Sequence, residues 1–588
     1  MGKFSTLGTA VSGLNAAQTG LYVTGHNMAN VDTVGFTRQQ AMQVDFPSLK
    51  LGNGVRSVNQ TGLGTNISET RQIRNRFLDI SYRREAGKHD YYNVKATTGY
   101  EIEHILGDLQ SDYNTDTVMK DLFNSLQDLS IDTQSLAARG TFVSTAVTFV
   151  DKVSNVYNRM QEYQDNLNEQ IKGAVIRVNQ LITSISNYNS LIMSNEVAGD
   201  NANDYRDARA VDIDELSHLL DIEYKENANG SVSIISEGKI LCADGARIQL
   251  GLRYTGPTND FVEPVVTTEA GILPWDEYAV TLFNFKKPIN ATLNNDSGKL
   301  KSLMVCRGFD LRTYADDIYA DKPEALPKPA GNYPGAGVSA DWDAYNQNRL
   351  ELNSWFDVNH SFLPRMMKEF DTIVNKIVTL INDSVAPYEG GVKSPQAPYD
   401  LNYSNTGGVE IFSRRYVERF DGDTYNEEDP ESYFTLYTSG NLMINPKLLE
   451  AGGYNLIALM QTPEPYDPEN AVNGISDNTI VLNDLLAKWK SKIVSVGGGE
   501  ELSIDDAYRQ FTNILGVETS EAANFADEQA VLLVQVDNKR QSISAVSLDE
   551  EMRNMMMYQH AYNAAARVVN VVDSMIDKIV NGTGRVGL

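Results

Sequence analysis

The sequence contains only two cysteines, Cys242 and Cys306, in 588 residues. Two cysteines in so long a chain do not make a disulfide framework, and nothing in the sequence indicates that they pair with each other. The first residues include no apolar segment of the kind found in a signal peptide, and no apolar run is long enough to cross a bilayer. We therefore expect a chain without a membrane span and without an ordinary cleaved signal.

Motifs for metal, phosphate and catalytic chemistry are also missing. The six histidines show no metal-ligand spacing, and His-Glu-x-x-His does not occur. The glycines at 497–499 lack the Lys and Ser/Thr of a phosphate-binding loop. Residues 421–423, Asp-Gly-Asp, begin like a calcium loop, but Tyr425 and the missing glycine two residues before Glu428 break the pattern. The sequence thus predicts no enzyme activity, no cofactor and no metal site.

Positive charge is scarce. The chain has 50 Lys and Arg against 78 Asp and Glu, a net charge of −28 at pH 7. This acidity argues against general nucleic-acid binding, which depends on neutralising phosphates. The most basic segment holds five arginines: Arg71, Arg74, Arg76, Arg83 and Arg84. They could form a solvated helix face or an inter-subunit contact with acidic neighbours, and the sequence leaves both interpretations open.

The segment of about 548–580 shows a clear helical periodicity. Ser547 and Glu550 have the spacing of a capping box, which predicts that a helix begins here. Residues spaced alternately by three and four then form two lines, as along a coiled-coil contact. The first line is Leu548, Met555, Tyr562, Val569 and Ile576, and the second is Met552, Gln559, Ala566, Asp573 and Val580.

A segment at the other end of the sequence, residues 4–28, shows the same alternation. Its members are Phe4, Leu7, Val11, Leu14, Gln18, Leu21, Gly25 and Met28. Glycines within it each lower helix propensity by on the order of 1 kcal/mol, but small residues also allow helices to approach closely. We interpret the two segments as partners in a coiled-coil rod into which the rest of the chain is inserted. Alternatively, each is an ordinary amphipathic helix on a globular core.

The middle of the chain is predicted to be mainly helical with a β-rich insertion, which makes the fold class mainly α within α+β. Helical periodicity returns near Arg71 and is longest over about 141–193, where Gly173 could divide the helix. Further helices are expected at about 115–129, 204–220, 355–382, from 478, and at 503–516 and 521–544. Strands are expected at 231–235, 247–250, 278–283 and 433–437, and an extended connector at 38–68. The prolines and glycines of 312–350 favour an extended excursion.

The chain is too long for one hydrophobic core, so several domains are expected. The patterns predict a terminal coiled-coil inner domain with its connector from residues 1–70 and 541–588. They predict an elongated helical domain from 71–220 and 446–540. The remaining residues, 221–445, would form a β-rich and mixed insertion that includes the helix near 355–382.

Two stretches near the ends resemble the terminal signatures of one bacterial family. Residues 12–18 read Ser-Gly-Leu-Asn-Ala-Ala-Gln, and residues 25–39 read Gly-His-Asn-Met-Ala-Asn-Val-Asp-Thr-Val-Gly-Phe-Thr-Arg-Gln. Residues 548–552 read Leu-Asp-Glu-Glu-Met, and residues 558–568 read Tyr-Gln-His-Ala-Tyr-Asn-Ala-Ala-Ala-Arg-Val. These resemble the axial proteins of the bacterial flagellum, and its hook-associated members most closely. The family usually has proline where Val34 stands and often tyrosine where Phe36 stands.

The resemblance implies a structural role for the chain. It implies a turn motif at Asn30, Thr33, Gly35 and Phe36, terminal helices that line a tube, and polymerisation as a short ring of identical subunits. The implied partners are further copies of the chain, the hook protein, a second junction protein on the filament side and a cytoplasmic export chaperone at the C-terminal helix. The implied location is the flagellum outside the cell, after export through the flagellar type III apparatus.

Two other interpretations stay open. The chain could be a hook or rod protein of the same family, although the long helix from about 141 and the Asp-Glu-Leu-Ser sequence at 214–217 speak against it. It could also be a surface-displayed binding or hydrolytic protein that uses the insertion at 221–445. A pocket there with converging carboxylates or histidines would favour this second interpretation.

Overall fold

The computed structural model describes residues 2–582, except residues 47–48, 51–59, 108–113, 198, 200, 245, 256–259, 268–270, 275–277, 286–288, 310–360, 396, 403–407, 430–432 and 461–473. The predicted excursion at 312–350 therefore lies outside the described residues. The chain divides into two compact units. One comprises Met1–Lys88, Arg177–Gln249 and Glu528–Leu588, and the other comprises His89–Ile176 and Leu250–Asp527. Helices α2 (Arg76–Leu106), α4 (Leu136–Glu196) and α12 (Ile504–Ser544) contribute residues to both units.

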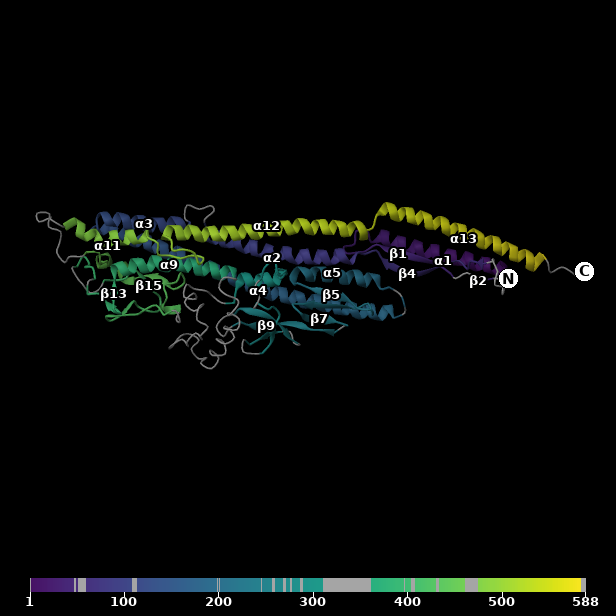
Figure 1. Ribbon diagram of the computed structural model, residues 1–588, viewed down its shortest axis with the longest axis horizontal. Coiled ribbons are helices and arrows are strands. Elements are labelled where there is room, and N and C mark those ends of the chain that lie inside the picture. Colours follow the sequence, from purple (N-terminus) through teal and green to yellow (C-terminus); the bar gives the residue numbers. More distant parts are fainter. Residues whose placement is uncertain are drawn as a thin grey trace, which may run out of the picture. The chain divides into compact units, whose positions relative to one another are not determined.

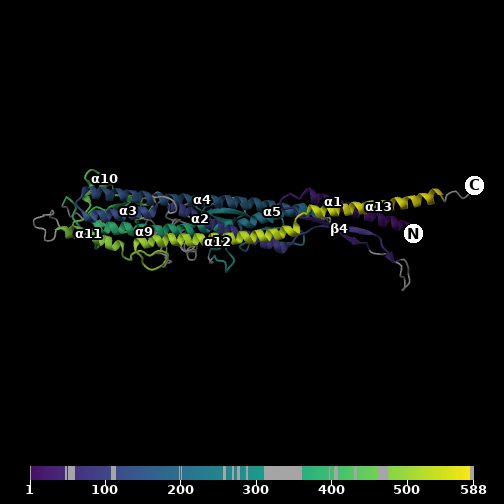
Figure 2. The ribbon, with the colours of Figure 1, turned by 90° about the horizontal axis from the view of Figure 1, so that it is seen from above.

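The first unit brings the two ends of the chain together. Helix α1 (Gly2–Ala29) and helix α13 (Leu548–Gly582) lie side by side (Figures 1 and 2). Strands β1 (Gln39–Asp45) and β4 (Thr65–Gln72) follow α1 as an antiparallel pair that packs against it, with a bulge between Met42 and Gln43. Two short strands, β2 (Leu49–Lys50) and β3 (Gln60–Thr61), pair with each other between them. The predicted extended connector is thus confirmed where it is described.

The rest of the first unit packs α5 (Asn203–Leu219) and the end of α4 with a small sheet. The sheet has the order β5 (Glu223–Glu226), β6 (Val232–Ser236), β7 (Lys239–Ala243) and β8 (Ala246–Arg247), with antiparallel neighbours. Asn189 of α4 is buried and fixes the sheet, because its amide both donates to the Val232 carbonyl at 2.9 Å and accepts from the Val232 N–H at 3.0 Å.

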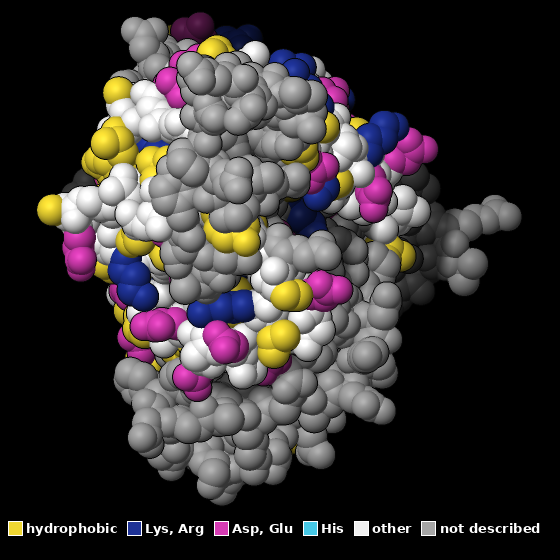
Figure 3. Space-filling model, turned by 90° about the vertical axis from the view of Figure 1, so that its left-hand side faces the viewer, with side chains coloured by type: hydrophobic (Ala, Val, Ile, Leu, Met, Phe, Trp, Pro, Cys, Tyr) yellow, Lys and Arg dark blue, Asp and Glu magenta, His cyan; other side chains and the backbone are white. Residues whose placement is uncertain are grey.

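Long helices dominate the second unit. They include parts of α2, α4 and α12 together with α3 (Thr115–Ile131), α6 (Lys299–Arg307), α9 (Phe362–Val385) and α11 (Gly474–Trp489). Residues that recur every three or four positions on α4 and α9 are buried, such as Phe149, Val153, Phe370 and Ile377. This period places one face of each helix in the core. On the face of the unit that Figure 3 shows, the described hydrophobic, acidic and basic side chains are interspersed.

Short strands complete the second unit. One sheet has the order β11 (Ile272–Leu273), β9 (Gln249–Tyr254), β10 (Val262–Thr267), β12 (Val280–Thr281). Another has the order β13 (Tyr388–Glu389), β14 (Val392–Lys393), β17 (Thr424–Tyr425), β16 (Phe420–Asp421). Strand β15 (Phe412–Arg414) pairs with β18 (Leu442–Ile444), which precedes α10 (Pro446–Leu449) and the 3₁₀ turn η2 (Gly453–Leu456). The predominance of helix over these smaller sheets confirms the predicted fold class.

Some predicted boundaries were wrong. The helices expected at 503–516 and 521–544 are one helix, α12, which continues through Gly516, and α4 likewise continues through Gly173. A glycine costs about 1 kcal/mol in a helix, less than burying a neighbour such as Phe511 contributes. The strand expected at 433–437 is instead the 3₁₀ turn η1 (Tyr433–Thr435).

The two compact units also divide the chain differently from the three predicted domains. Strands β5 to β8, which we assigned to the insertion at 221–445, belong to the same unit as the terminal helices. The strands from β9 onward, with nearly all of their residues after 249, belong to the other unit. The three-part division stays a prediction.

Candidate functional site

The face of α13 that lies against α1 has a heptad spacing. Its covered residues are spaced alternately by four and three positions, and Glu551 and Val572 among them are buried. The covered residues with this spacing are Glu551, Met555, Tyr558, Tyr562, Ala565, Val569, Val572 and Ile576, and Glu550, Asn554 and Ala566 beside them are also half-buried. This is the spacing of a coiled-coil contact. One predicted line therefore coincides with covered positions from Met555 onward.

The second predicted line on α13 lies one residue away from the covered one. Ala566 is half-buried, whereas Met552, Gln559, Asp573 and Val580 are exposed. Leu548, at the start of the first line, is also exposed. The positions one residue earlier, Glu551, Tyr558, Ala565 and Val572, are buried or half-buried, and the residues predicted at the contact stay a prediction.

The buried residues on α1 are small. They are Ala10, Ala16, Ala17, Gly20, Thr24 and Asn27. Gly20 lies against the ring of Tyr558, and a Cβ at this position would fall 2.6 Å from the ring atoms. The large residues that we predicted at the contact are half-buried (Leu7, Leu14, Leu21 and Met28) or exposed (Val11), and the side chain of Phe4 lies outside the described residues. Because the two helices approach closely through small residues, the small side chains of α1 are buried and the larger predicted ones lie beside them.

A second apolar stripe runs along the exposed surface of α13. It consists of Val568, Val571, Met575 and Ile579, which are 42–54% exposed. Their spacing of three and four places them in one line along the helix, beside the covered line of Val569, Val572 and Ile576. An exposed stripe of this kind on a folded subunit is typical of a surface that another molecule covers.

A buried carboxylate holds the start of α13 to the segment that follows α1. Glu551 is 2% exposed and accepts hydrogen bonds from Arg38 Nε at 2.8 Å and from Asn27 Nδ2 at 3.1 Å. Arg38 also pairs with Glu550 at 2.7 Å, and its N–H donates to the carbonyl of Ser544 at 2.8 Å. Glu550, which we expected to cap the helix together with Ser547, is thus bound to Arg38. We name Asn27, Arg38 and Glu551 the latch.

The turn after α1 is built from the residues of the predicted turn motif. The side chain of Asn30 donates to the His26 carbonyl at 3.0 Å and accepts from the Thr33 hydroxyl at 3.2 Å. The ring of Phe36 packs edge-on against His26 with 5.4 Å between centroids. Gly35 has a φ of +79°, a conformation that favours glycine. Val34, where the family usually has proline, is almost fully exposed.

Gly35 also lies close to α5. A Cβ at this position would fall 2.1 Å from Cγ2 of Val211. We therefore expect Gly35→Ala to destabilise the first unit by about 2 kcal/mol, because strain at positive φ adds to the clash. Gly238→Ala is the matched control, since Gly238 has a φ of +74° and nothing within 4 Å. Urea unfolding of both variants measures the difference, and equal losses would show that the contact with Val211 contributes nothing.

Helix α5 anchors the turn through two acidic side chains. Asp207 accepts from the Thr37 N–H at 3.0 Å and from Gln72 Nε2 at 2.7 Å. Asp204 lies 3.3 Å from His26 Nε2 and accepts from Gln39 Nε2 at 3.1 Å. Burial raises the pKa of Asp207 to about 6, against the opposing effect of its hydrogen bonds.

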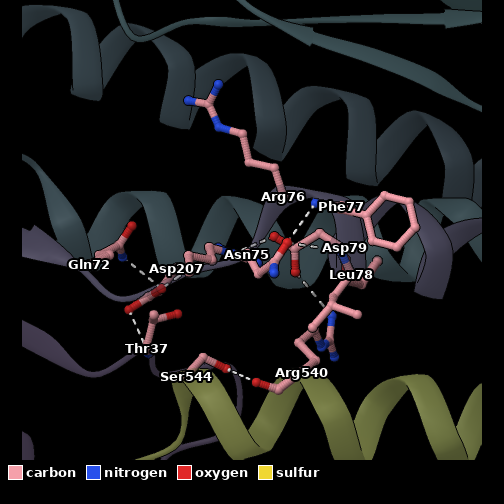
Figure 4. A network of polar contacts seen from close by, with 12 residues as sticks. Thr37, Gln72, Asn75, Arg76, Phe77, Leu78, Asp79, Asp207, Arg540 and Ser544 are labelled. Atoms are coloured by element: carbon pink, nitrogen blue, oxygen red, sulfur yellow. Dashed lines mark hydrogen bonds and ion pairs between the residues drawn. The ribbon is translucent and has the colours of Figure 1, made fainter.

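Charged residues of α2, α5 and α12 form a further network near this turn. Arg540 Nη1 lies 2.5 Å from Asp214 and 3.9 Å from Asp79, and Arg83 Nε lies 2.7 Å from Asp214. Arg74 Nε lies 2.8 Å from the other oxygen of Asp79. Figure 4 shows Arg540 reaching toward Asp79, with Thr37 and Gln72 directed at Asp207. The network ties the last turns of α12 to the unit that carries the latch.

Metal binding, the two cysteines and membrane spans can also be checked in the structure. Within the described part of the chain, His, Cys, Asp and Glu form no group of three that could hold a metal ion. Cys242 and Cys306 are buried free thiols. Among the helices as far as they are described, none is long and apolar enough to span a membrane.

Comparison with known proteins finds flagellar rod, hook junction and hook-associated proteins. Three family models match: the helical domain of flagellar hook-associated protein FlgK over residues 100–319, flagella basal body rod protein over 7–37, and the C-terminal part of flagellar basal body rod FlgEFG protein over 538–582. Flagellar hook-associated protein 1 of Bacillus subtilis is 27% identical over 586 residues, which cover 99% of this chain and 98% of that protein. The chain is similar to flagellar hook-associated protein 1 along almost its whole length.

Other members of the hook-associated protein 1 family agree. The Escherichia coli protein of that name is 23% identical over 584 residues, covering 98% of this chain and 99% of that protein. The solved structure of the flagellar hook junction protein FlgK from Burkholderia pseudomallei has a TM-score of 0.51 and 12% identity. It covers 80% of this chain and 100% of that chain, and at this identity it speaks for the fold alone.

The three residues of the latch are not among the contact positions that the heptad spacing predicts. Asn27 and Arg38 lie within the stretch 25–39, and Glu551 lies within 548–552, both of which carry the family resemblance. That resemblance was the available signal. Nothing in the spacing of these three residues shows that they meet, because the contact joins positions more than 500 residues apart.

Proposed function

We propose that the chain is a structural, non-catalytic subunit of the bacterial flagellum that polymerises as an adaptor ring between hook and filament. The observation that carries this proposal is the exposed apolar stripe of Val568, Val571, Met575 and Ile579 on α13. The adjoining line of the same helix packs against α1, and the latch holds its start. A helix that is fixed in this way and has half-exposed apolar side chains beside the contact can pack against a further subunit.

The partners follow from this arrangement and from the family. Copies of the chain cover one another's α13 stripes and so close the ring. The hook protein contacts the ring on one side, and a second junction protein contacts it on the filament side. The match to the hook-associated helical domain over residues 100–319 favours this position over that of a hook or rod protein.

Before assembly the stripe needs protection. Apolar side chains exposed to this degree on a long helix promote aggregation in the cytoplasm. A cytoplasmic chaperone that binds α13 covers them until the chain leaves through the flagellar type III apparatus. The mature location is then the flagellum outside the cell.

Deletion of the gene tests the proposed function. We expect cells without the chain to build hooks, to lack filaments, to release filament protein into the medium and not to swim. Expression of the intact chain in the deletion strain restores filaments and serves as the control. Normal filaments in the deletion strain would disprove the junction role, and loss of hooks as well would place the chain in the hook or rod instead.

A further inference from the structure

Six arginines line one cavity in the first unit. The cavity has a volume of about 350 Å³ and is lined by Arg71, Arg74, Arg76, Arg83, Arg206 and Arg209, which come from the end of β4, the start of α2 and α5. Only two acidic residues, Asp79 and Glu226, are among the lining residues that the structure describes. A positively charged cavity is unexpected in a chain with a net charge of −28. We name it the arginine cavity.

Four of these arginines are compensated within the unit. Arg74 pairs with Asp79, Arg76 with Glu226, Arg83 with Asp214, and Arg206 with Glu196 and Glu226. These ion pairs hold the four guanidinium groups in place around the cavity. The positive charges of the other two arginines that line it are not paired in this way.

Arg209 and Arg71 differ from the other four. Arg209 is 4% exposed and donates to Asn189 Oδ1 at 2.7 Å and to the Gly230 carbonyl at 2.8 Å, which are neutral acceptors. Arg71, at the exposed rim, donates to the neutral side chain of Gln40 at 3.3 Å. Neither has a carboxylate within 4 Å in the described part of the chain. Burial and the neighbouring Arg206 lower the pKa of Arg209 to about 10, against the opposing effect of Glu226 and Glu196, which lie near it without forming an ion pair with it.

We propose that the arginine cavity is a carboxylate site, and that in the polymer it takes an acidic side chain from a second copy of this chain. The planar guanidinium fork matches a carboxylate and binds it through two parallel hydrogen bonds. A carboxylate beside Arg209 offsets part of the cost of burying this cation, whose own hydrogen bonds go to the neutral acceptors of Asn189 and Gly230. The cavity of about 350 Å³ has room for one such group and about ten waters, since a water molecule fills about 30 Å³.

Charge complementarity identifies the partner. Each copy of the chain carries 78 Asp and Glu, so identical subunits repel one another unless acidic groups of one copy meet cations of the next. This inference rests on the proposed function, because it requires that copies assemble. It also decides between the two interpretations of the basic segment in favour of an inter-subunit contact for Arg71 and Arg76.

The first test asks whether the cavity binds an oxyanion at all. The full-length monomer is heated in inorganic phosphate and in chloride at equal ionic strength. We expect phosphate to raise the unfolding temperature of the intact chain by about 3 °C, because a ligand that binds only the folded state stabilises it. The double variant Arg71→Gln/Arg76→Gln, which changes the two exposed rim arginines, should lose at least half of this shift.

The matched control is Arg84→Gln/Lys225→Gln. Both residues are exposed, lie in the same unit and do not line the cavity, so the charge lost is equal. The control should keep the full shift. No shift in the intact chain, or an equal shift in both double variants, would overturn the carboxylate site.

The second test identifies the source of the carboxylate. A photocrosslinking amino acid replaces Gln40, whose side chain contacts Arg71 at the rim, and the chain is expressed in the deletion strain. Irradiated flagella should yield a product of two copies of this chain, joined beside an Asp or Glu. The same replacement at Lys225 should yield little of it.

The outcomes separate this inference from the proposed function. If the intact chain restores filaments but the product contains another flagellar protein, or no product forms, the second copy is excluded as the source. If phosphate binds under the same conditions, a free anion occupies the cavity instead. If the intact chain does not restore filaments, the proposed function itself has failed, whatever the phosphate result.

Discussion

Val571→Asp combined with Met575→Asp should abolish filament assembly while leaving the chain folded. Both residues lie on the exposed apolar stripe of α13, at 54% and 49% exposure, one helical turn apart. Because they are exposed in the subunit, the change should alter its unfolding temperature little. In the polymer each aspartate would be buried without a partner, at a cost of several kcal/mol, which is more than one subunit contact tolerates. We expect swimming and filament number in the complemented deletion strain to fall to the level of the deletion itself.

The matched control is Asn570→Asp with Ser574→Asp. These two residues have the same i, i+4 spacing, are exposed and lie on the polar side of the same helix. The control adds the same charge to α13 and should leave filaments nearly normal. Equal loss in both variants would mean that added charge, not the apolar stripe, prevents assembly. Normal filaments in the Val571/Met575 variant would remove the stripe from the subunit contact.

Glu551→Ala should release α13 from the turn after α1. Alanine preserves helix propensity, so the helix itself is not penalised. The change leaves Arg38 and Asn27 without their buried acceptor, and breaking a buried charge pair from one side costs about 3 kcal/mol. We expect amide hydrogen exchange to accelerate strongly over residues 548–582 and filament assembly to fall severely. Exchange in α9, which belongs to the second unit, should not change.

Glu550→Ala is the control for this prediction. Glu550 is the adjacent residue, has the same chemistry and pairs with the same arginine, but 46% of its side chain is exposed. An exposed ion pair contributes at most about 1 kcal/mol, so exchange and assembly should change little. If the two variants behave alike, burial of Glu551 is not what holds the helix.

The sequence predicted both terminal helices, and the two helices pack against each other. On α13 the predicted line of Met555, Tyr562, Val569 and Ile576 is half-buried, whereas most of the second line is exposed. The second line was chosen by apolar character, which favours Met552 over Glu551. In the structure Glu551 is buried because Arg38 and Asn27 satisfy it. Hydrophobicity alone cannot predict a buried carboxylate whose partners are far away in the sequence.

The ends of helices and strands were also not predictable from local sequence alone. Gly516 looked like the end of a helix, but burial of Phe511, Leu515 and Thr519 around it keeps α12 continuous. Residues 433–437 had the composition of a strand, but Tyr433–Thr435 form the 3₁₀ turn η1. Local propensities amount to about 1 kcal/mol or less per residue, and packing supplies larger free energies wherever the two disagree.

The sequence by itself determined the mainly helical class, the two terminal helices, the turn motif around Gly35 and the resemblance to flagellar axial proteins, and it suggested that the two helices pair. Each of these depends on local periodicity or on a contiguous motif, which a chain carries in its own order of residues. Only the tertiary structure decided which faces of α1 and α13 meet, which stripe stays exposed, the latch at Glu551 and the arginine cavity. Those features join side chains from distant segments, and their free energies depend on burial and on distances that no spacing along the chain specifies.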